Sequence, residues 1–498
     1  MGLRTNAIAN YLGNGYGIVA ALLVIPIYID LLGEEAYGLV GFFLLAQVWL
    51  ALLDLGLSQM TTRSAASFGL RDRERFAGLV KTLEWPFMAM FILASAVFTL
   101  GGEMIAERWL VTKDLEADTT LTCLSAMGVS IGLRLWMALY KSSLQGLQNQ
   151  VTLNVVNILG TTLRYPGSLV FLVLMDVGIQ EFFFYQAAVN AFELLISAFA
   201  LYRLLPRALR WIPVFNWLEL KSSLPFAFSV AYTSLLTVLI VQVEKLAFSG
   251  ALSLVDFGFL TLVVTISGGI LQMSGPIVQA VLPRLTEHHA ASDADSFRKL
   301  YLDGAEVMSL ILFPITFAVA IFSQPLLLAW TGSLEAADWG ENLLGWYIVG
   351  NCFMAFSSFT YFLQYVSGRL HLHVRYLTLC AIFQAPILVL LVLRGEVTLV
   401  AILWCGFRLA DLTLWAPYVH KKFAPGLYLP FVRRCIPSLV ICASLLLSAR
   451  WVLEGMQDWS RGSVLFGLVA LAIGAAITSS AASPLGRWYL AKLIKLTV

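Results

Sequence analysis

Apolar stretches of membrane-spanning length follow one another along the whole chain, and short polar segments separate them. A helix needs roughly 20 apolar residues to cross the hydrocarbon core of a bilayer. Little chain remains for a soluble domain, so we expect the functional part to lie within the membrane. This pattern predicts about 14 transmembrane helices, near residues 10–31, 38–60, 84–105, 119–140, 153–175, 182–202, 225–248, 256–281, 304–323, 343–364, 376–394, 397–418, 435–453 and 464–482.

The composition supports this all-α, polytopic membrane class. The 498 residues are 59% hydrophobic and 12% charged, whereas soluble domains carry about 25% charged residues. The six cysteines form no C-x-x-C pair, so we interpret them as small buried hydrophobes. Glycines and prolines at Gly268–Gly269 and Gly275–Pro276 are expected to interrupt the eighth helix.

The distribution of Lys and Arg predicts the orientation in the membrane. Cytoplasmic loops carry an excess of basic residues, and basic residues follow every second predicted helix: a cluster at 63–81, Lys141, a cluster at 203–221, a cluster at 284–299, Arg369 and Arg375, and a cluster at 421–434. The intervening loops hold few basic residues. An even number of helices with both termini in the cytoplasm follows from this alternation.

The two halves of the chain show a weak repeat. Tyr37-Gly38 opens the second predicted helix and Phe257-Gly258 opens the eighth, and a charged loop of similar length follows each helix. Six helices separate the copies, so the repeats are parallel, an arrangement that places substrate sites between lobes near the midplane. The expected domains are an N-lobe of helices 1–6 (1–203), a cytoplasmic linker (204–224), a C-lobe of helices 7–12 (225–419), a C-terminal helix pair 13–14 (435–482) and a cytoplasmic tail (483–498).

Four basic side chains fall inside predicted spans. Arg164 and Arg408 lie deepest, Arg134 lies nearer the inner end and Lys245 nearer the outer end. Charges within a bilayer are costly and by default face a cavity or a partner. Arginine's planar fork binds phosphate oxygens bidentately, which indicates an anionic headgroup. Alternatively, Arg134 and Lys245 extend to an interface.

Acidic side chains also fall within or at the ends of the spans. They are candidates for carrying a coupling Na⁺ or H⁺, or for ion pairs. Arg408 and Asp411 are three residues apart on one helical face and can pair with each other. The acidic candidates are Asp54, Glu193, Glu244 and Asp411.

No catalytic or metal-binding pattern is present in the sequence. The chain has no Walker loop, GxSxG elbow or HExxH helix, so we expect a non-enzymatic protein without a cofactor, a metal or a nucleic-acid partner.

Several segments resemble the Wzx-type polysaccharide flippases of the multidrug/oligosaccharidyl-lipid/polysaccharide (MOP) exporter superfamily. Asp-Leu-Gly-Leu, from Asp54, is the most distinctive. The matches cover much of residues 1–335, whereas residues 340–498 match in topology only. The segments are PIYIDLLGEEAYGLVGF from Pro26, LLDLGLSQMTTRSAA from Leu52, LQGLQNQVTLNVVN from Leu144, VEKLAFSGALSLVDFGFL from Val243, VLPRLTEHHAASDADSFRKLY from Val281 and FPITFAVAIFSQPLLLAWTG from Phe313.

The resemblance implies a MATE-like bundle of two lobes around a cationic cavity, in the bacterial inner membrane. Its implied substrate is an undecaprenyl-pyrophosphate-linked oligosaccharide (an O-antigen, capsule or exopolysaccharide repeat unit), which moves from the inner to the outer leaflet by alternating access. The related lipid II flippases also have fourteen helices, and their C-terminal pair forms a groove for the lipid tail. Expected partners are this glycan, membrane lipids, a coupling Na⁺ or H⁺, and other glycan-assembly membrane proteins.

Two other classes remain as alternatives. A drug/cation antiporter of the same superfamily usually has about twelve helices and an acid-rich N-lobe, which fits this chain less well. A membrane glycan polymerase or ligase generally carries a large periplasmic domain. Here the longest predicted outside loop, Ser323 to Asn342, is short.

Overall fold

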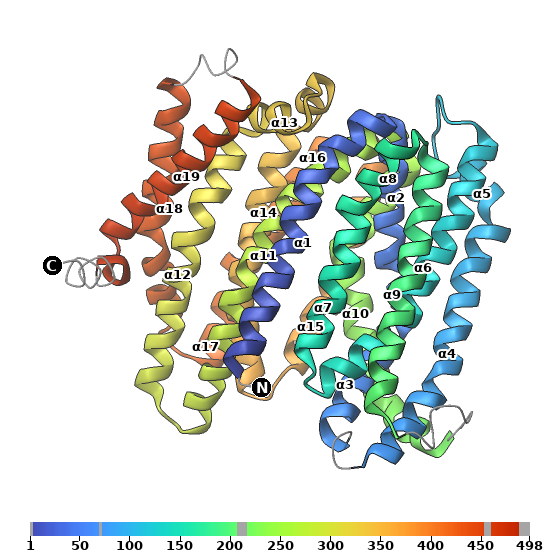
Figure 1. The fold of residues 1–498 in the computed structure, drawn as a ribbon. Helices are drawn as coiled ribbons and strands as arrows, with labels where there is room; N and C mark the ends of the chain where they lie inside the picture. The colour runs from blue at the N-terminus through green and yellow to red at the C-terminus, as the bar shows by residue number, and fades with distance from the viewer. Residues whose placement is uncertain (1–2, 69–71, 207–216, 453–459, 488–498) are drawn as a thin grey trace. The chain divides into compact units, whose positions relative to one another are not determined.

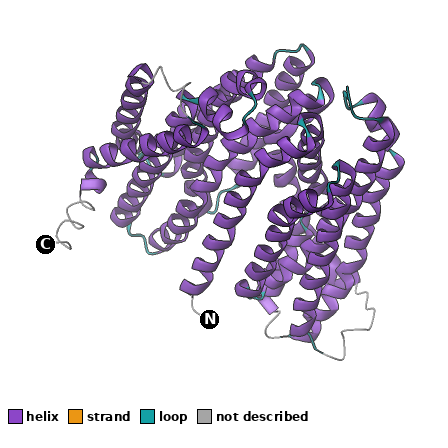
Figure 2. Cartoon of the chain, turned by 45° about the horizontal axis from the view of Figure 1, so that its top comes forward, coloured by secondary structure: helices purple, strands orange, loops and turns teal. Residues whose placement is uncertain are grey.

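The computed structural model describes residues 3–68, 72–206, 217–452 and 460–487. Over these residues the chain is helical, with a single-residue bridge between Val111 and Ser253 as its only extended pairing (Figures 1 and 2). Its helices include 14 that are long and apolar enough to cross a membrane. The predicted all-α polytopic fold is therefore confirmed. In a bilayer this is the expected solution, because a helix satisfies its own backbone hydrogen bonds without water.

The chain divides into two compact units, Met1–Gly258 and Phe259–Val498. In the first unit α6 is the central helix, and it packs extensively against α4, α9 and α3. The lobe boundaries expected from the sequence stay a prediction, and residues 207–216 of the expected linker lie outside the described part. The helices of the first unit are α1 (Leu3–Leu32), α2 (Glu34–Leu50), α3 (Leu57–Phe68), α4 (Arg73–Leu100), α5 (Gly102–Arg108), α6 (Ala117–Gly146), α7 (Gln150–Thr162), α8 (Ser168–Met175), α9 (Ile179–Leu204) and α10 (Trp217–Ala251).

The second unit is built around α12 and α14, which pack against each other and against α18 and α16 respectively. Helix α11 begins in the first unit and continues in the second. The helices are α11 (Leu254–Ala290), α12 (Ala294–Ile321), α13 (Ser323–Thr331), α14 (Leu334–Val366), α15 (His371–Leu393), α16 (Val397–Ala410), α17 (Ala416–Phe423), α18 (Tyr428–Val452) and α19 (Arg461–Ala482).

The second predicted helix, 38–60, is interrupted rather than continuous. Helix α2 passes into a 3₁₀ turn, Ala51–Asp54, and Leu55 and Gly56 then adopt positive φ angles of 46° and 76°. Asp54 starts α3 by accepting a hydrogen bond from the backbone N–H of Ser58 (3.1 Å). Glycine is required at position 56, because a side chain there would meet the backbone of Ala227 and because positive φ favours glycine.

The segment expected to connect two spans on the outside, Ser323 to Asn342, contains α13 and the start of α14, and its side of the membrane stays a prediction. One expectation about bends was wrong. The glycines and prolines at 268–276 do not interrupt the eighth predicted helix, because α11 runs unbroken from Leu254 to Ala290. Neighbouring helices and local adjustments tolerate such residues in membrane helices.

The two glycines that mark the sequence repeat pack against each other. A Cβ placed on Gly258 would lie 3.2 Å from the backbone nitrogen of Gly38, and one on Gly38 would collide with the carbonyl of Leu254. Helices α2 and α11 therefore approach backbone to backbone at their first turns. This is the close contact that small residues permit between membrane helices.

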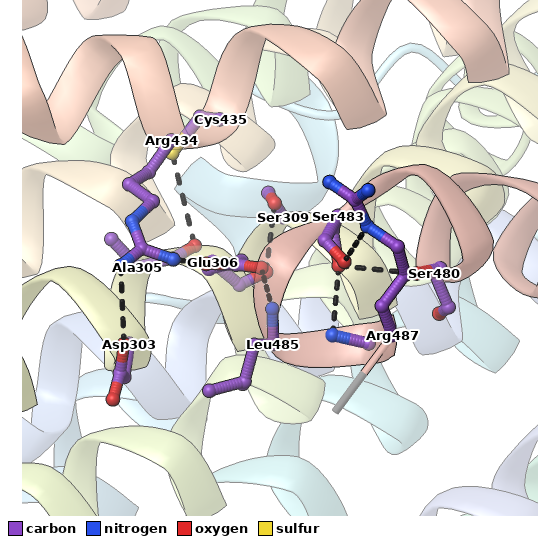
Figure 3. Close-up of polar contacts among 11 residues, drawn as sticks. Asp303, Ala305, Glu306, Ser309, Arg434, Cys435, Ser480, Ser483, Leu485 and Arg487 are labelled. Atoms are coloured by element: carbon purple, nitrogen blue, oxygen red, sulfur yellow. Dashed lines mark hydrogen bonds and ion pairs between the residues drawn. The ribbon is translucent and has the colours of Figure 1, made fainter. Parts of the chain in front are cut away.

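A buried carboxylate attaches the C-terminal helix pair to α12. Glu306 is fully buried, forms an ion pair with Arg434 of α18, and accepts a hydrogen bond from the backbone N–H of Leu485 (2.8 Å), beyond α19 (Figure 3). Arg434 also lies 3.7 Å from Asp303 (Figure 3). One acid thus holds α12, α18 and the segment after α19 together. The predicted tail beyond residue 487 lies outside the described residues.

The glycine contact gives a first prediction. We expect Gly38→Ala to destabilise the protein by about 1–3 kcal/mol, because the new methyl group forces the two backbones apart. A thermal melt of the purified protein in detergent measures this. Gly78→Ala on α4 is the matched control: nothing lies within 4 Å of its added carbon, and alanine favours a helix by about 1 kcal/mol over glycine. Equal melting temperatures for the two variants would contradict the assigned packing.

Candidate functional site

A cluster of charges lies within the first unit, between α6, α7 and α9. The carboxylate of Glu193 on α9 contacts two cations: Nζ of Lys141 on α6 at 2.5 Å, and Nη2 of Arg164 at 2.6 Å. The same Nη2 donates to the amide oxygen of Asn190 (3.0 Å). Asn190 in turn donates to Ser130 of α6 (2.5 Å). The network therefore fixes Nη2 of the Arg164 guanidinium through Glu193 and Asn190.

Local backbone geometry places these groups. Arg164 sits in a π-helical turn, Leu163–Gly167, that contains Pro166 and joins α7 to α8. Such turns occur frequently at functional sites. Gly160, one turn earlier, leaves the space that the Glu193 carboxylate fills, since a Cβ there would lie 2.5 and 2.7 Å from the two carboxylate oxygens.

Arg134 belongs to the same group. It is half-buried on α6 and close enough to Arg164 and Glu193 to interact with both electrostatically. Within the described ranges its guanidinium has no ion-pair or hydrogen-bond partner. Two cations, Lys141 and Arg164, thus pair with the Glu193 carboxylate, and Arg134 is a third cation in their neighbourhood.

Sequence reasoning missed Lys141, which it placed on an inner loop. The structure places Lys141 within α6, seven residues after Arg134. Seven residues are close to two helical turns, so both side chains lie on the same face. This spacing was the signal that could have identified it.

A second cluster lies within the second unit. Arg408 Nη1 forms an ion pair with Asp411 (2.9 Å), and its Nη2 donates to Gln384 of α15 (3.0 Å). The ring of Trp404 lies 4.5 Å from the guanidinium carbon, and Tyr376 donates to Asp411. Both charged side chains are buried, with 7% and 8% exposed. Here one cation and one acid balance each other.

The remaining predicted residues lie in other settings. Lys245 on α10 donates to the carbonyl of Val241 (2.6 Å) and lies 3.6 Å from the fully buried Glu244. Asp54 serves as the cap of α3. The binding and coupling roles predicted for these residues stay predictions. No group of His, Cys, Asp and Glu in the described residues is arranged to hold a metal ion.

An apolar groove of about 570 Å³ runs along the second unit between α12 and α19. Its walls are aliphatic except for one methionine, Met273, and one proline, Pro314, which are also apolar. The groove is lined by Met273, Leu310, Ile311, Pro314, Ile315, Ala318, Val319, Leu326, Leu465, Leu468, Val469, Ala472, Ile473 and Ala476. It can hold a flexible hydrocarbon chain.

The described residues form a multi-pass bundle with 14 helices long and apolar enough to cross a membrane. Residues 3–289, more than half of the chain, match the family described as "Polysaccharide biosynthesis protein". The chain therefore belongs to that family. No curated protein matches the chain in sequence.

Solved structures share the fold at low identity. The lipid II flippase MurJ, in an inward closed conformation, has a TM-score of 0.68 at 12% identity, covering 96% of this chain and 98% of that one. An inward-facing multidrug resistance MATE transporter of the MOP superfamily has a TM-score of 0.57 at 13% identity, covering 96% of both chains. The eukaryotic MATE transporter AtDTX14 scores 0.58 at 12% identity, covering 86% of this chain and 97% of its own.

The balanced pair in the second unit gives a stability prediction. We expect Asp411→Asn to destabilise the protein by about 3–5 kcal/mol, because it leaves the buried Arg408 cation uncompensated. Chemical or thermal unfolding in detergent measures the loss. Glu396→Gln, an exposed acid before α16, removes the same charge and is expected to change stability little. An Asp411→Asn variant as stable as the wild type would show that the pair contributes nothing.

Proposed function

We propose that the protein is a flippase for an undecaprenyl-pyrophosphate-linked oligosaccharide, which it moves from the inner to the outer leaflet of the bacterial inner membrane by alternating access. The candidate glycans are O-antigen, capsule and exopolysaccharide repeat units. The match to a polysaccharide biosynthesis family supports a glycan as part of the substrate. The observation that carries the proposal is the excess of cations over acids around Arg164 within the membrane-spanning helices.

The charge excess suits a pyrophosphate. Uncompensated cations inside a bilayer are expensive and mark substrate pathways by default. Two of the three cations are arginines, whose planar donors bind phosphate oxygens in pairs. Lys141 adds a compact third charge, which also binds phosphate. We assign binding of the pyrophosphate to Arg164, Lys141 and Arg134.

The apolar groove between α12 and α19 supplies a place for the lipid tail. Its walls present no charge, and a polyprenyl chain has none. This proposal follows the resemblance to lipid II flippases, whose C-terminal pair holds the tail. The first predicted span, 10–31, contains no arginine, whereas those flippases carry a buried one in their first helix, so lipid II itself is the less favoured substrate.

A cation-coupled antiporter is the second candidate. Similarity to MATE transporters supports it, together with the buried acids Glu193 and Asp411. The same acids, with Asp54 and Glu244, are our candidates for carrying a coupling Na⁺ or H⁺ in a flippase. Uptake of an organic cation by proteoliposomes, without glycan transport, would favour the antiporter.

The first functional prediction concerns Arg164. In proteoliposomes, we expect Arg164→Gln to lower the rate of pyrophosphate-linked oligosaccharide translocation by about tenfold or more, because a charge-assisted pair worth 1.5–3 kcal/mol is lost. Protection of the glycan from an external glycosidase reports the translocated fraction. Arg408→Gln in the same assay tests the prediction that Arg408 also binds the pyrophosphate.

Arg394→Gln is the control for Arg164→Gln. It removes an exposed arginine that follows α15 and is expected to leave translocation unchanged. Gel filtration confirms that each variant is folded. Wild-type activity in a folded Arg164→Gln variant would remove this residue from the proposed site while leaving the flippase function in place.

The groove gives a separate prediction. Ala472→Phe places a ring inside it, so we expect translocation of the polyprenyl-linked substrate to fall several-fold while a short-chain analogue is affected less. Ala470→Phe on the same helix adds the same ring outside the groove lining and is the control. If the two variants affected both substrates equally, the groove would not be the binding place of the lipid tail.

A further inference from the structure

The Glu193 carboxylate occupies the position that an anionic ligand of this cluster would take. Each of its two oxygens contacts one cation, Oε1 with Lys141 at 2.5 Å and Oε2 with Arg164 at 2.6 Å. Only 3% of its side chain is exposed. One phosphate group presents oxygens to two cations in the same way. The carboxylate therefore fills an anion site from within the chain.

The fold leaves a specific space for this carboxylate. The side chain lies against the backbone of α7 at Gly160, where a single added carbon would come within 2.7 Å of both oxygens. The contact involves the far end of a flexible side chain, so the carboxylate can change position by rotation about its own side-chain bonds.

The cluster also has more donors than the carboxylate can satisfy. Nε of Arg164 is buried and has no hydrogen-bond partner in the described part of the chain. The guanidinium of Arg134 is likewise unpartnered there. A buried unsatisfied donor costs about 1–3 kcal/mol, and a ligand with more oxygens than a carboxylate removes that cost.

We propose that Glu193 is an internal competitor for the substrate anion: a diphosphate displaces it from Lys141 and Arg164, and its return displaces the diphosphate. This inference rests on the proposed function and adds a means of release. A transport site must bind strongly enough to load and weakly enough to unload. A competing carboxylate lowers the affinity of the three cations for a diphosphate and so favours its release.

The test measures binding and turnover separately, with inorganic pyrophosphate as the binding probe for the full-length protein in detergent. We expect Glu193→Gln to bind pyrophosphate about tenfold tighter, because a negative charge a few ångströms from the ligand is gone. At saturating substrate, we expect its translocation rate in proteoliposomes to fall, because release becomes slow.

Gly160→Ala tests the same idea without changing any charge. Its methyl group pushes the carboxylate away from the cations, so tighter pyrophosphate binding is expected here too. This variant also keeps the proposal testable if Glu193→Gln does not fold. Glu84→Gln is the matched control, since Glu84 is a Lys-paired acid of the same unit, and its pyrophosphate affinity should equal that of the wild type.

Weaker pyrophosphate binding by both Glu193→Gln and Gly160→Ala would overturn the proposal, because Glu193 would then position the cations rather than compete for them. Unchanged affinity in both variants would overturn it as well. These results are separable from the proposed function. Tighter binding in both variants without any glycan translocation would support the competitor and reject the flippase.

Discussion

The cost of a charge in a low-dielectric medium decides how the polar residues of this protein are placed. An arginine within a bilayer needs a counter-charge, hydrogen-bond acceptors or water. Arg164 and Arg408 each have a carboxylate within ion-pair distance and an amide oxygen at 3.0 Å. The two arrangements differ in balance. Arg408 pairs with one acid, whereas Arg164 shares its acid with Lys141 and has Arg134 as a further cation nearby, so cations outnumber acids in the first cluster only.

The two arrangements recur at close to the offset of the predicted sequence repeat. Gly38 and Gly258 are 220 positions apart, as are Arg164 and Gln384, while Glu193 and Asp411 are 218 apart. In the first unit the arginine comes from α7–α8 and the acid and amide from α9. In the second, α15 gives the amide, while arginine and acid lie together on α16 and the turn after it. In each unit an arginine, a carboxylate and an amide join two neighbouring helices. Between the two units, the arginine and the amide have exchanged helices.

Much of the fold and part of the site could be predicted from the sequence. Hydropathy identified the 14 spans because lipid demands long apolar helices. The position of Arg164, Arg408 and Glu193 within predicted spans marked them as candidate site residues, and the structure places all three in the two charge clusters. Hydropathy did not locate the break at Leu55–Gly56, which depends on packing against Ala227. Lys141 was assigned to a loop, because a basic residue near a span end usually marks the interface, although its seven-residue spacing from Arg134 was a signal for the shared helical face that the structure shows.

The π-helical turn around Arg164 has a consequence for the geometry of its helix. A turn of this kind holds one residue more than an α-helical turn, so everything after it is out of phase by about 100° with everything before it. A single inserted residue therefore determines which side chains of α8 lie on the same side of the helix as a given side chain of α7. Were the turn to tighten to ordinary α-helix, Arg164 and the residues after it would rotate relative to α7, while the helix ends would shift by only about 1.5 Å. Here the phase of a helix, rather than its tilt, determines which neighbour a cation faces.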